Sequence, residues 1–278
     1  MIHSIPAEFP FEEVQKRIQF ILSILPSVSQ ELVKYQSVVV QNRGSLPFKE
    51  ILTNVDNHAE RPILLALQSN FSEDQISAEM AGDQGDDSDF HWWIDALDGS
   101  RNFVHGNPLY CISIGLSFRD HPVAGVVHVP AFNETYRAIF GDGAFKNNEP
   151  INTSNTASLD TALVASGLPF QRRGIITELI GDISAIISAG AGLRKTGSAV
   201  LDICWTAEGR FDAMWERHVH PWDTCAAGVI LREAGGRLSD FHGRIFDINT
   251  GDVVASNELL HNDILNILKQ VREVGGMN

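Results

Sequence analysis

Apolar residues recur at helical spacing in several parts of the chain. Val14, Ile18, Ile21 and Leu25 fall on one face of a helix over residues 11–25. Similar stripes predict further helices over residues 57–69, 179–189, 199–208, 224–234 and 258–272. A helix of this kind buries its apolar stripe against a neighbouring layer, so we expect a packed core rather than an extended chain.

Three residues mark where these helices should bend or begin. Pro62 lies inside the second predicted helix, and we expect it to kink or shift that helix because its ring removes a backbone donor. Ser198 and Asp223 each stand immediately before a later predicted helix. Both residue types favour the N-cap position, so we expect each of them to cap the helix that follows it.

Short apolar runs bounded by turn residues predict strands over residues 75–79, 91–95, 110–118 and 123–130. The turn-rich stretch GDGAFKNNEPI is typical of a hairpin. Strands that come first and alternating elements that come later indicate a layered α/β or α+β fold. We expect one domain made of two coupled halves, about 1–150 and about 151–278, with a soft boundary at NNEPINTS.

Composition and charge narrow the classes of partner. The formal net charge of −14 argues against nucleic acid, because binding a polyanion needs clustered Lys and Arg. No apolar run reaches the roughly 20 residues that span a bilayer, and the start of the sequence lacks a signal-peptide pattern. Three sparse cysteines favour a reducing compartment over a disulfide framework. We therefore expect a cytoplasmic protein with no membrane partner.

Candidate chemistry gathers in the stretch WWIDALDGSRNFVHG. Asp95 stands at the mouth of an apolar strand, and Asp98 follows three residues later, where a turn can bring both carboxylates to one point. Gly99 and Ser100 then offer backbone N–H groups at a helix start, which can cradle a phosphate. These groups indicate a metal-assisted phosphate site, although an ordinary Asp-Gly turn remains the simple alternative for this stretch alone.

Two further acids could complete such a site from elsewhere in the chain. Glu79 ends the SAE segment in the way that Asp95 ends its own strand. Asp223, in HPWDTCAAG, can cap a helix with one oxygen and bind a metal ion with the other. The alternative interpretations are that Glu79 is a surface acid at a strand end and that Asp223 only caps its helix.

Five motifs in order resemble the inositol monophosphatase family of metal-dependent, lithium-sensitive sugar phosphatases. They are TNVDNHAE (53–60), SAEM (77–80), DALDGSRNFVH (95–105), GSAVLDICWTAEGRFDA (197–213) and WDTCAAGVILREAGG (222–236). The resemblance covers nearly the whole chain, and it implies an αβαβα sandwich of the sugar-phosphatase type, usually assembled as a homodimer. Three positions depart from the family pattern, since Ala96 replaces a proline, Ser100 replaces a threonine and Met80 replaces a second acid.

The resemblance also implies two or three Mg²⁺ ions per active site. The implied ligands of the first ion are Glu79, Asp95 and the Leu97 carbonyl, and those of the second are Asp95, Asp98 and Asp223. Asp56, together with Glu79, would lie near a third, weaker ion. Mg²⁺ would explain how an acidic protein accepts an anionic ester.

The implied reaction is hydrolysis of a phosphate monoester by a metal-activated water, with Glu79, Ser100 and Asp56 as catalytic residues. Phosphate and substrate contacts are expected from Asp98, Gly99, Ser100, Ser198, Ala199 and Glu216. Carboxylates accept hydrogen bonds from vicinal hydroxyls, so Glu216 favours inositol monophosphate or a similar small polyol phosphate.

Two other interpretations stay open. The same chemistry could act on histidinol phosphate, fructose 1,6-bisphosphate or a 3′-phosphonucleotide. A protein with this fold could also act as a non-catalytic regulator that binds a partner protein.

Overall fold

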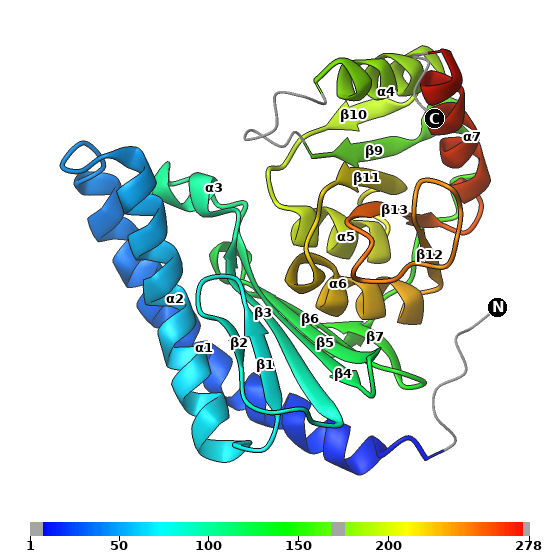
Figure 1. The fold of residues 1–278 in the computed structure, drawn as a ribbon. Coiled ribbons are helices and arrows are strands. Elements are labelled where there is room, and N and C mark those ends of the chain that lie inside the picture. Colours follow the sequence, from blue (N-terminus) through cyan, green and yellow to red (C-terminus); the bar gives the residue numbers. More distant parts are fainter. Residues whose placement is uncertain (1–7, 168–175, 275–278) are drawn as a thin grey trace.

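The computed structural model describes residues 8–167 and 176–274 as five stacked layers (Figure 1). Helices α1 (Phe11–Gln41) and α2 (Phe48–Asn70) cover the outer face of the first sheet. Helices α5 (Ala199–Ala207) and α6 (Pro221–Glu233) lie between the two sheets. Helices α4 (Ile176–Ser188) and α7 (His261–Val274) form the opposite outer layer. This order confirms the predicted layered αβαβα architecture.

The first sheet has the strand order β2-β1-β3-β4-β5-β6-β7-β8. Its strands are β1 (Gln75–Ala78), β2 (Gly82–Gln84), β3 (Phe90–Asp98), β4 (Cys111–Phe118), β5 (His121–Val129), β6 (Glu134–Ile139), β7 (Gly143–Lys146) and β8 (Glu149–Pro150). All its neighbours pair antiparallel except β1 and β3, which run parallel. The short helix α3 (Ser100–Val104) follows β3 directly, and the 3₁₀ turn η1 (Pro130–Phe132) follows β5.

The second sheet has the order β10-β9-β11-β13-β12. Its strands are β9 (Leu163–Ser166), β10 (Gly192–Arg194), β11 (Ala213–Arg217), β12 (Gly236–Ser239) and β13 (Asp252–Asn257). The first sheet therefore ends at Pro150 and the second begins at Leu163, after the 3₁₀ turn η2 (Leu159–Thr161). None of the helices in the described part of the chain is long and apolar enough to cross a membrane.

Glycines let the first sheet approach α6 closely. A Cβ atom at Gly115 would lie 2.6 Å from Cys225 Sγ, and one at Gly125 would lie 2.5 Å from the Cα of Ala226. Real side chains cannot approach so closely, so larger residues would push the helix off strands β4 and β5. Helix α6 also carries Asp223, so this contact fixes where that residue lies relative to the first sheet.

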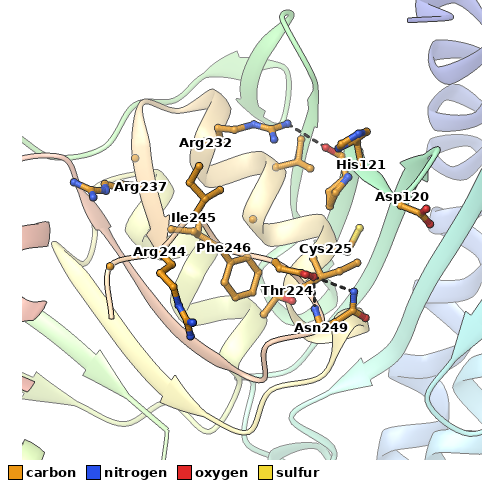
Figure 2. Close-up of a pocket in the computed structure, with 18 of the residues that line it drawn as sticks. Asp120, His121, Thr224, Cys225, Arg232, Arg237, Arg244, Ile245, Phe246 and Asn249 are labelled. Atoms are coloured by element: carbon orange, nitrogen blue, oxygen red, sulfur yellow. Dashed lines mark hydrogen bonds between the residues drawn. The ribbon is translucent and has the colours of Figure 1, made fainter. Parts of the chain in front are cut away.

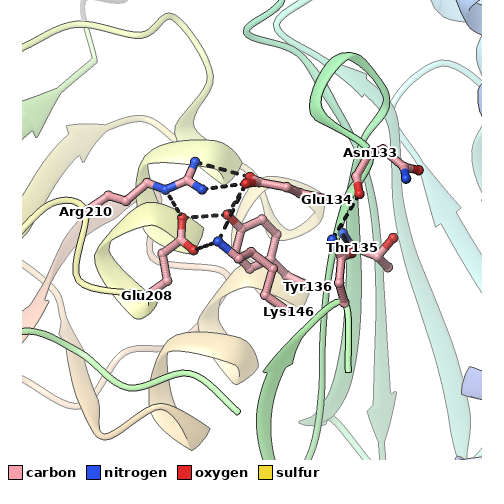
Figure 3. A network of polar contacts seen from close by, with 8 residues as sticks. Asn133, Glu134, Thr135, Tyr136, Lys146, Glu208 and Arg210 are labelled. Carbon is pink, nitrogen blue, oxygen red and sulfur yellow. Dashed lines mark hydrogen bonds and ion pairs between the residues drawn. The ribbon is translucent and has the colours of Figure 1, made fainter. Parts of the chain in front are cut away.

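A polar network joins the first sheet to the end of α5 (Figure 3). The Tyr136 hydroxyl on β6 donates to Glu208 over 2.7 Å and is 3.0 Å from Glu134. Lys146 on β7 forms ion pairs with Glu208 and Glu134, and Arg210 pairs with the same two carboxylates. Two acids thus share two cations and one phenol at the junction between layers.

Both long N-terminal helices exceed their predicted ranges. Helix α1 continues past Pro26 to Gln41, and α2 begins at Phe48 and passes through Pro62 as one element. Each proline removes one backbone hydrogen bond, but the apolar stripe on either side is buried against the neighbouring layers. Packing against the neighbouring layers therefore maintains each helix past a proline, where the local sequence alone would end it.

The predicted strands and the hairpin are present, although β3 extends to Asp98 and β1 ends one residue before Glu79. The N-cap prediction for Ser198 is confirmed, because its hydroxyl accepts from Leu201 N over 3.1 Å.

The N-cap prediction for Asp223 is wrong. Helix α6 starts at Pro221 and has His220 as its N-cap, so Asp223 is the third helical residue. Proline is well suited to the first helical position because that residue needs no N–H donor, and the helix therefore starts at residue 221 rather than at the predicted 224.

Candidate metal and phosphate site

A bulge at the end of β3 brings Asp95 and Asp98 to one side of the sheet. Asp95 pairs with Ser113 on β4, whereas Asp98 pairs with Cys111, so three steps along β3 match two steps along β4. Residues three apart on a regular strand face opposite sides, but one extra residue restores the same side. The Leu97 amide, inside the bulge, donates to Asp95 Oδ1 over 2.9 Å and fixes that carboxylate.

Glu79 lies beside Asp95 because strands β1 and β3 are parallel. Ala78 pairs with Ile94 in the register, and the Glu79 amide donates to the Ile94 carbonyl over 3.1 Å. The residues that follow this pair, Glu79 and Asp95, are both acids and therefore lie side by side. Asp95 is only 3% exposed, whereas the Glu79 side chain keeps contact with solvent. The pair forms an acidic edge with a buried end and an open end.

Glu60 on α2 holds the segment that follows Glu79. Its two carboxylate oxygens accept from the amides of Met80 and Ala81 over 2.9 and 2.8 Å. Glu60 is 3% exposed, and sequence reasoning gave it no role although it ends the TNVDNHAE motif. Met80 makes this contact through its backbone amide, so its side chain takes no part in it.

Asp98 is held by the start of α5. Its Oδ2 accepts from the Ser198 hydroxyl over 2.5 Å and from the Val200 amide over 3.0 Å. Ser198 therefore caps α5 and positions Asp98 at once. Ala199 is the first residue of that helix and is half-buried.

Gly99 is required where β3 turns into α3. Its φ is +86°, and a Cβ atom there would lie 2.7 Å from the Leu109 carbonyl oxygen. Helix α3 begins at Ser100, so the amides of its first turn have no intrahelical acceptor. A second link comes from the Asn102 amide, which donates to the Leu109 and Thr196 carbonyls over 2.6 and 3.0 Å. The turn is thereby fixed against the loop that leads into α5.

Asp223 and Asp56 approach the same region from two different helices. Asp223 Oδ2 accepts from the His220 amide over 2.7 Å. Asp56, on α2, has a buried Oδ1 without a hydrogen-bond partner in the part of the chain that the structure describes. A buried oxygen without a hydrogen-bond partner lowers the stability of the folded state, and a nearby cation would supply the missing interaction.

The acids raise one another's pKa values. Burial and the charges of Glu79 and Glu60 raise the pKa of Asp56 to about 8. Burial and the charge of Asp98 raise the pKa of Glu79 to about 7. Burial, with the charges of neighbouring acids, likewise raises the pKa values of Asp95 and Asp223. The groups that oppose these shifts at Asp95 and Asp223 are backbone amides, so the cluster has a strong affinity for positive charge.

This donor set fits Mg²⁺. All the converging side chains offer oxygen, and Mg²⁺ prefers oxygen ligands. In residues 8–167 and 176–274, no group of three or more His, Cys, Asp or Glu side chains is arranged to hold a metal ion by itself. A Mg²⁺ site commonly uses one or two carboxylates and takes its other ligands from water and substrate phosphate. Such an ion would give the buried Asp56 Oδ1 a partner and would reduce the mutual repulsion of the acids.

Glu216 borders the site on the side of the second sheet. A Cβ atom at Gly167 would lie 1.9 Å from the Glu216 carboxyl carbon, so Gly167 leaves the space that this carboxylate uses. Burial and the charges of Asp202 and Asp98 raise the pKa of Glu216 to about 8, and Lys195 opposes that shift.

Asp202 on α5 is a second residue that sequence reasoning missed. It is 1% exposed, accepts from the Thr196 hydroxyl over 2.7 Å, and has a pKa raised to about 8 by burial. An acid within the apolar AVLDIC run was the available signal, because such a position rarely holds an unpaired charge.

Comparison with known proteins shows the family to which this chain belongs. Residues 12–273 match the model of the inositol monophosphatase family. An inositol-1-monophosphatase of Synechocystis sp. (strain ATCC 27184 / PCC 6803 / Kazusa) is 38% identical over 216 residues, which are 77% of this chain and 75% of that relative. The chain belongs to the inositol monophosphatase family. It is a phosphoric monoester hydrolase.

Other relatives carry different names. A fructose-1,6-bisphosphatase/inositol-1-monophosphatase of Aquifex aeolicus (strain VF5) is 34% identical over 81% of this chain and 84% of that relative. The crystal structure of the extragenic suppressor protein suhB from Bartonella henselae superposes with a TM-score of 0.84 and 26% identity, and covers 92% of this chain and 99% of that one.

Proposed function

We propose that this protein is a Mg²⁺-dependent phosphomonoesterase that hydrolyses inositol monophosphate or a similar small polyol phosphate. The observation that carries the proposal is the cluster of Glu79, Asp95, Asp98 and Asp223 beside the start of α3. Burial raises the pKa of all four acids, and the charge of Asp98 raises the pKa values of the other three further. Negative charge concentrated beside a helix start suits an anionic ester only if cations come with it.

The oxygen ligands for Mg²⁺ would come from Glu79, Asp95, Asp98, Asp223 and the Leu97 carbonyl, with Asp56 near a further ion. When bound, Mg²⁺ would neutralise the ester oxygens and lower the pKa of water. Two or three ions per site are expected from this ligand set.

The residues of the chain would position the reacting groups. The amides of Gly99 and Ser100 would hold the phosphate, and the Ser100 hydroxyl and Glu79 would orient the attacking water. Asp56 would support Glu79 from α2. Most of the rate enhancement would come from this positioning and from charge stabilisation, as in other phosphoryl transfers.

The substrate preference rests on Glu216. The charge of Asp98 raises the pKa of Glu216, so the two carboxylates lie within electrostatic range of each other. Ser198 and Ala199, at the start of α5, would border the sugar. Carboxylates accept from neighbouring hydroxyls, which favours a polyol over a nucleotide. Fructose 1,6-bisphosphate remains an alternative because of the name that the Aquifex aeolicus relative carries. Histidinol phosphate and a 3′-phosphonucleotide are weaker alternatives.

A substrate panel tests the proposal. Phosphate release would be measured from inositol 1-phosphate, histidinol phosphate, fructose 1,6-bisphosphate and a 3′-phosphonucleotide, with Mg²⁺ and with EDTA. We expect Mg²⁺-dependent release with the highest kcat/KM for inositol 1-phosphate. Glu216→Gln should raise the KM for that ester about tenfold and leave the KM for phenyl phosphate, which has no hydroxyls, nearly unchanged.

Other outcomes of the panel are also informative. A higher kcat/KM for another ester would overturn the polyol preference but retain the site. Failure of every ester would favour the second candidate, a non-catalytic regulator, which the suppressor name of the Bartonella henselae protein makes worth testing.

We also propose a cytoplasmic homodimer without nucleic-acid or membrane partners. The three cysteines are buried free thiols, as a reducing compartment favours. Ile176, Ile180 and Ile187 expose about half of their surface along α4, and a second copy would cover this apolar stripe. Sedimentation of the full chain at two concentrations checks the dimer.

A further inference from the structure

A cavity lies beside α6, and none of the acids Glu79, Asp95, Asp98 and Asp223 lines it. It has a volume of about 660 Å³, within the range of small-molecule sites. Its walls are one face of α6, the β4–β5 turn, strand β12 and the loop over residues 243–249 (Figure 2). Apolar side chains make up much of the lining, among them Val229, Leu238, Ile245, Phe246 and Ile248.

Three arginines also line this cavity, although the protein has a net charge of −14. Arg244 donates to Asp240 over 2.6 Å, and Arg237 is 3.8 Å from Glu258 and 3.4 Å from Asn262. Both lie toward the rim. These two cations are compensated within the protein.

Arg232 differs from the other two. Its Nη2 donates to the Pro122 carbonyl over 3.2 Å, and its buried Nε has no hydrogen-bond partner among the described residues. Its only paired carboxylate among the described residues is that of Glu233: Oε1 is 3.7 Å from Nε, beyond hydrogen-bond distance, and Oε2 accepts from the amides of Gly141 and Gly143. Figure 2 shows Arg232 directed toward the β4–β5 turn, on the side opposite Arg237. A partly desolvated guanidinium with unused donors is suited to an anion.

The remaining charges limit that anion to a single negative charge. Asp120, Asp247 and Glu258 also line the cavity. Asp247 accepts from Asn249 and is solvent-exposed, and Asp120 is exposed at the turn. These acids would repel a doubly charged phosphate more than a carboxylate. The apolar walls, with Phe246 among them, favour a ligand with a flat ring.

We propose that this cavity binds a small aromatic monocarboxylate, with its carboxylate on Arg232 and its ring against Phe246 and the apolar walls. The bidentate geometry of guanidinium and carboxylate would orient the ligand. This site is separate from the acidic cluster and does not depend on the proposed hydrolysis.

Calorimetric titration of the full chain with 2-naphthoate tests the proposal. We expect one site per chain and at least about tenfold weaker binding of the neutral analogue 2-naphthamide, because the amide lacks the charge. Arg232→Met should weaken 2-naphthoate binding by about tenfold, whereas Arg237→Gln should leave it unchanged.

A surface variant keeps the test independent of folding at Arg232. Ile245 is 50% exposed, so Ile245→Glu should fold normally and weaken 2-naphthoate binding about tenfold by repulsion at the cavity mouth. Leu65→Glu, at a similarly exposed position on α2, is the matched control and should bind as the wild type does. No binding by the wild type, equal affinity for acid and amide, or unchanged affinity in Ile245→Glu would overturn the proposal.

Discussion

Two groups of carboxylates in this protein differ in what neutralises them. At the junction between layers, Glu134 and Glu208 share Lys146, Arg210 and the Tyr136 hydroxyl (Figure 3). Burial alone would raise the pKa of Glu134, but Arg210, Tyr136 and Lys146 together lower it. This network is electrostatically complete without any ligand.

The acidic cluster at the end of β3 has the opposite character. Burial raises the pKa of Asp95, and the charges of Glu79, Asp98 and Asp223 raise it further. The hydrogen bonds that hold these acids come from backbone amides and the Ser198 hydroxyl, none of which carries a positive charge. Buried acids with internal cations are structural, whereas buried acids without them indicate a site for a cation from outside.

The largest effect is expected from Asp95→Asn. Removing the oxygen that we propose both Mg²⁺ ions share should lower kcat/KM for inositol 1-phosphate by at least about a hundredfold, because charge stabilisation is lost at the reacting phosphate. The same change removes a buried charge among like charges, so the melting temperature in EDTA at pH 8 should rise.

Asp86→Asn is the control for this change, since it alters the same charge in an exposed loop. It should change neither activity nor melting temperature. A variant Asp95→Asn with wild-type activity would contradict the assignment of Asp95.

Without metal, the free energy of unfolding should decrease as the pH rises. The pKa values of Asp56, Glu216 and Asp202 are raised to about 8 and that of Glu79 to about 7. Such groups bind protons more tightly in the folded state, so their contribution is complete below about pH 4 and is lost as the pH rises through 7 to 8. In EDTA, the free energy of unfolding by urea should fall between about pH 5 and 8.

Saturating Mg²⁺ should remove the part of that decrease that comes from Asp56 and Glu79, because the ion stabilises the charged forms of the acids it contacts. A pH profile of stability that is flat in EDTA, or identical with and without Mg²⁺, would contradict this account. It would show that the charges of the acidic cluster are already compensated within the protein.

The paired network should affect stability alone. Lys146→Met leaves Glu208, whose side chain is 5% exposed, with one cation fewer, and it should lower the free energy of unfolding by about 1–3 kcal/mol. The kcat/KM should stay within about twofold of the wild-type value, since this variant leaves the acidic cluster intact. Lys34→Met on the exposed side of α1 is the matched control.

The sequence was sufficient for the residues at the end of β3 but not for their supports. Asp95, Asp98 and Gly99 are consecutive parts of one motif, so local pattern reveals them. The bulge that turns both aspartates to one side depends on the register with β4, which is a long-range pairing.

The two missed residues act through contacts that no single motif contains. Glu60 acts through the amides of Met80 and Ala81, about twenty residues later, and Asp202 acts through Thr196 across a helix start. Helix α1 passes Pro26 because its stripe is buried, which local propensity does not include.

The most direct test is a calorimetric titration of the metal-free protein with Mg²⁺, for the wild type, Asp95→Asn and Lys146→Met. If the acidic cluster is a cation site, the wild type and Lys146→Met bind Mg²⁺ with the same affinity, and Asp95→Asn binds it at least about tenfold more weakly. Absence of Mg²⁺ binding by the wild type, or equal binding by Asp95→Asn, would contradict the assignment of these acids to a metal site.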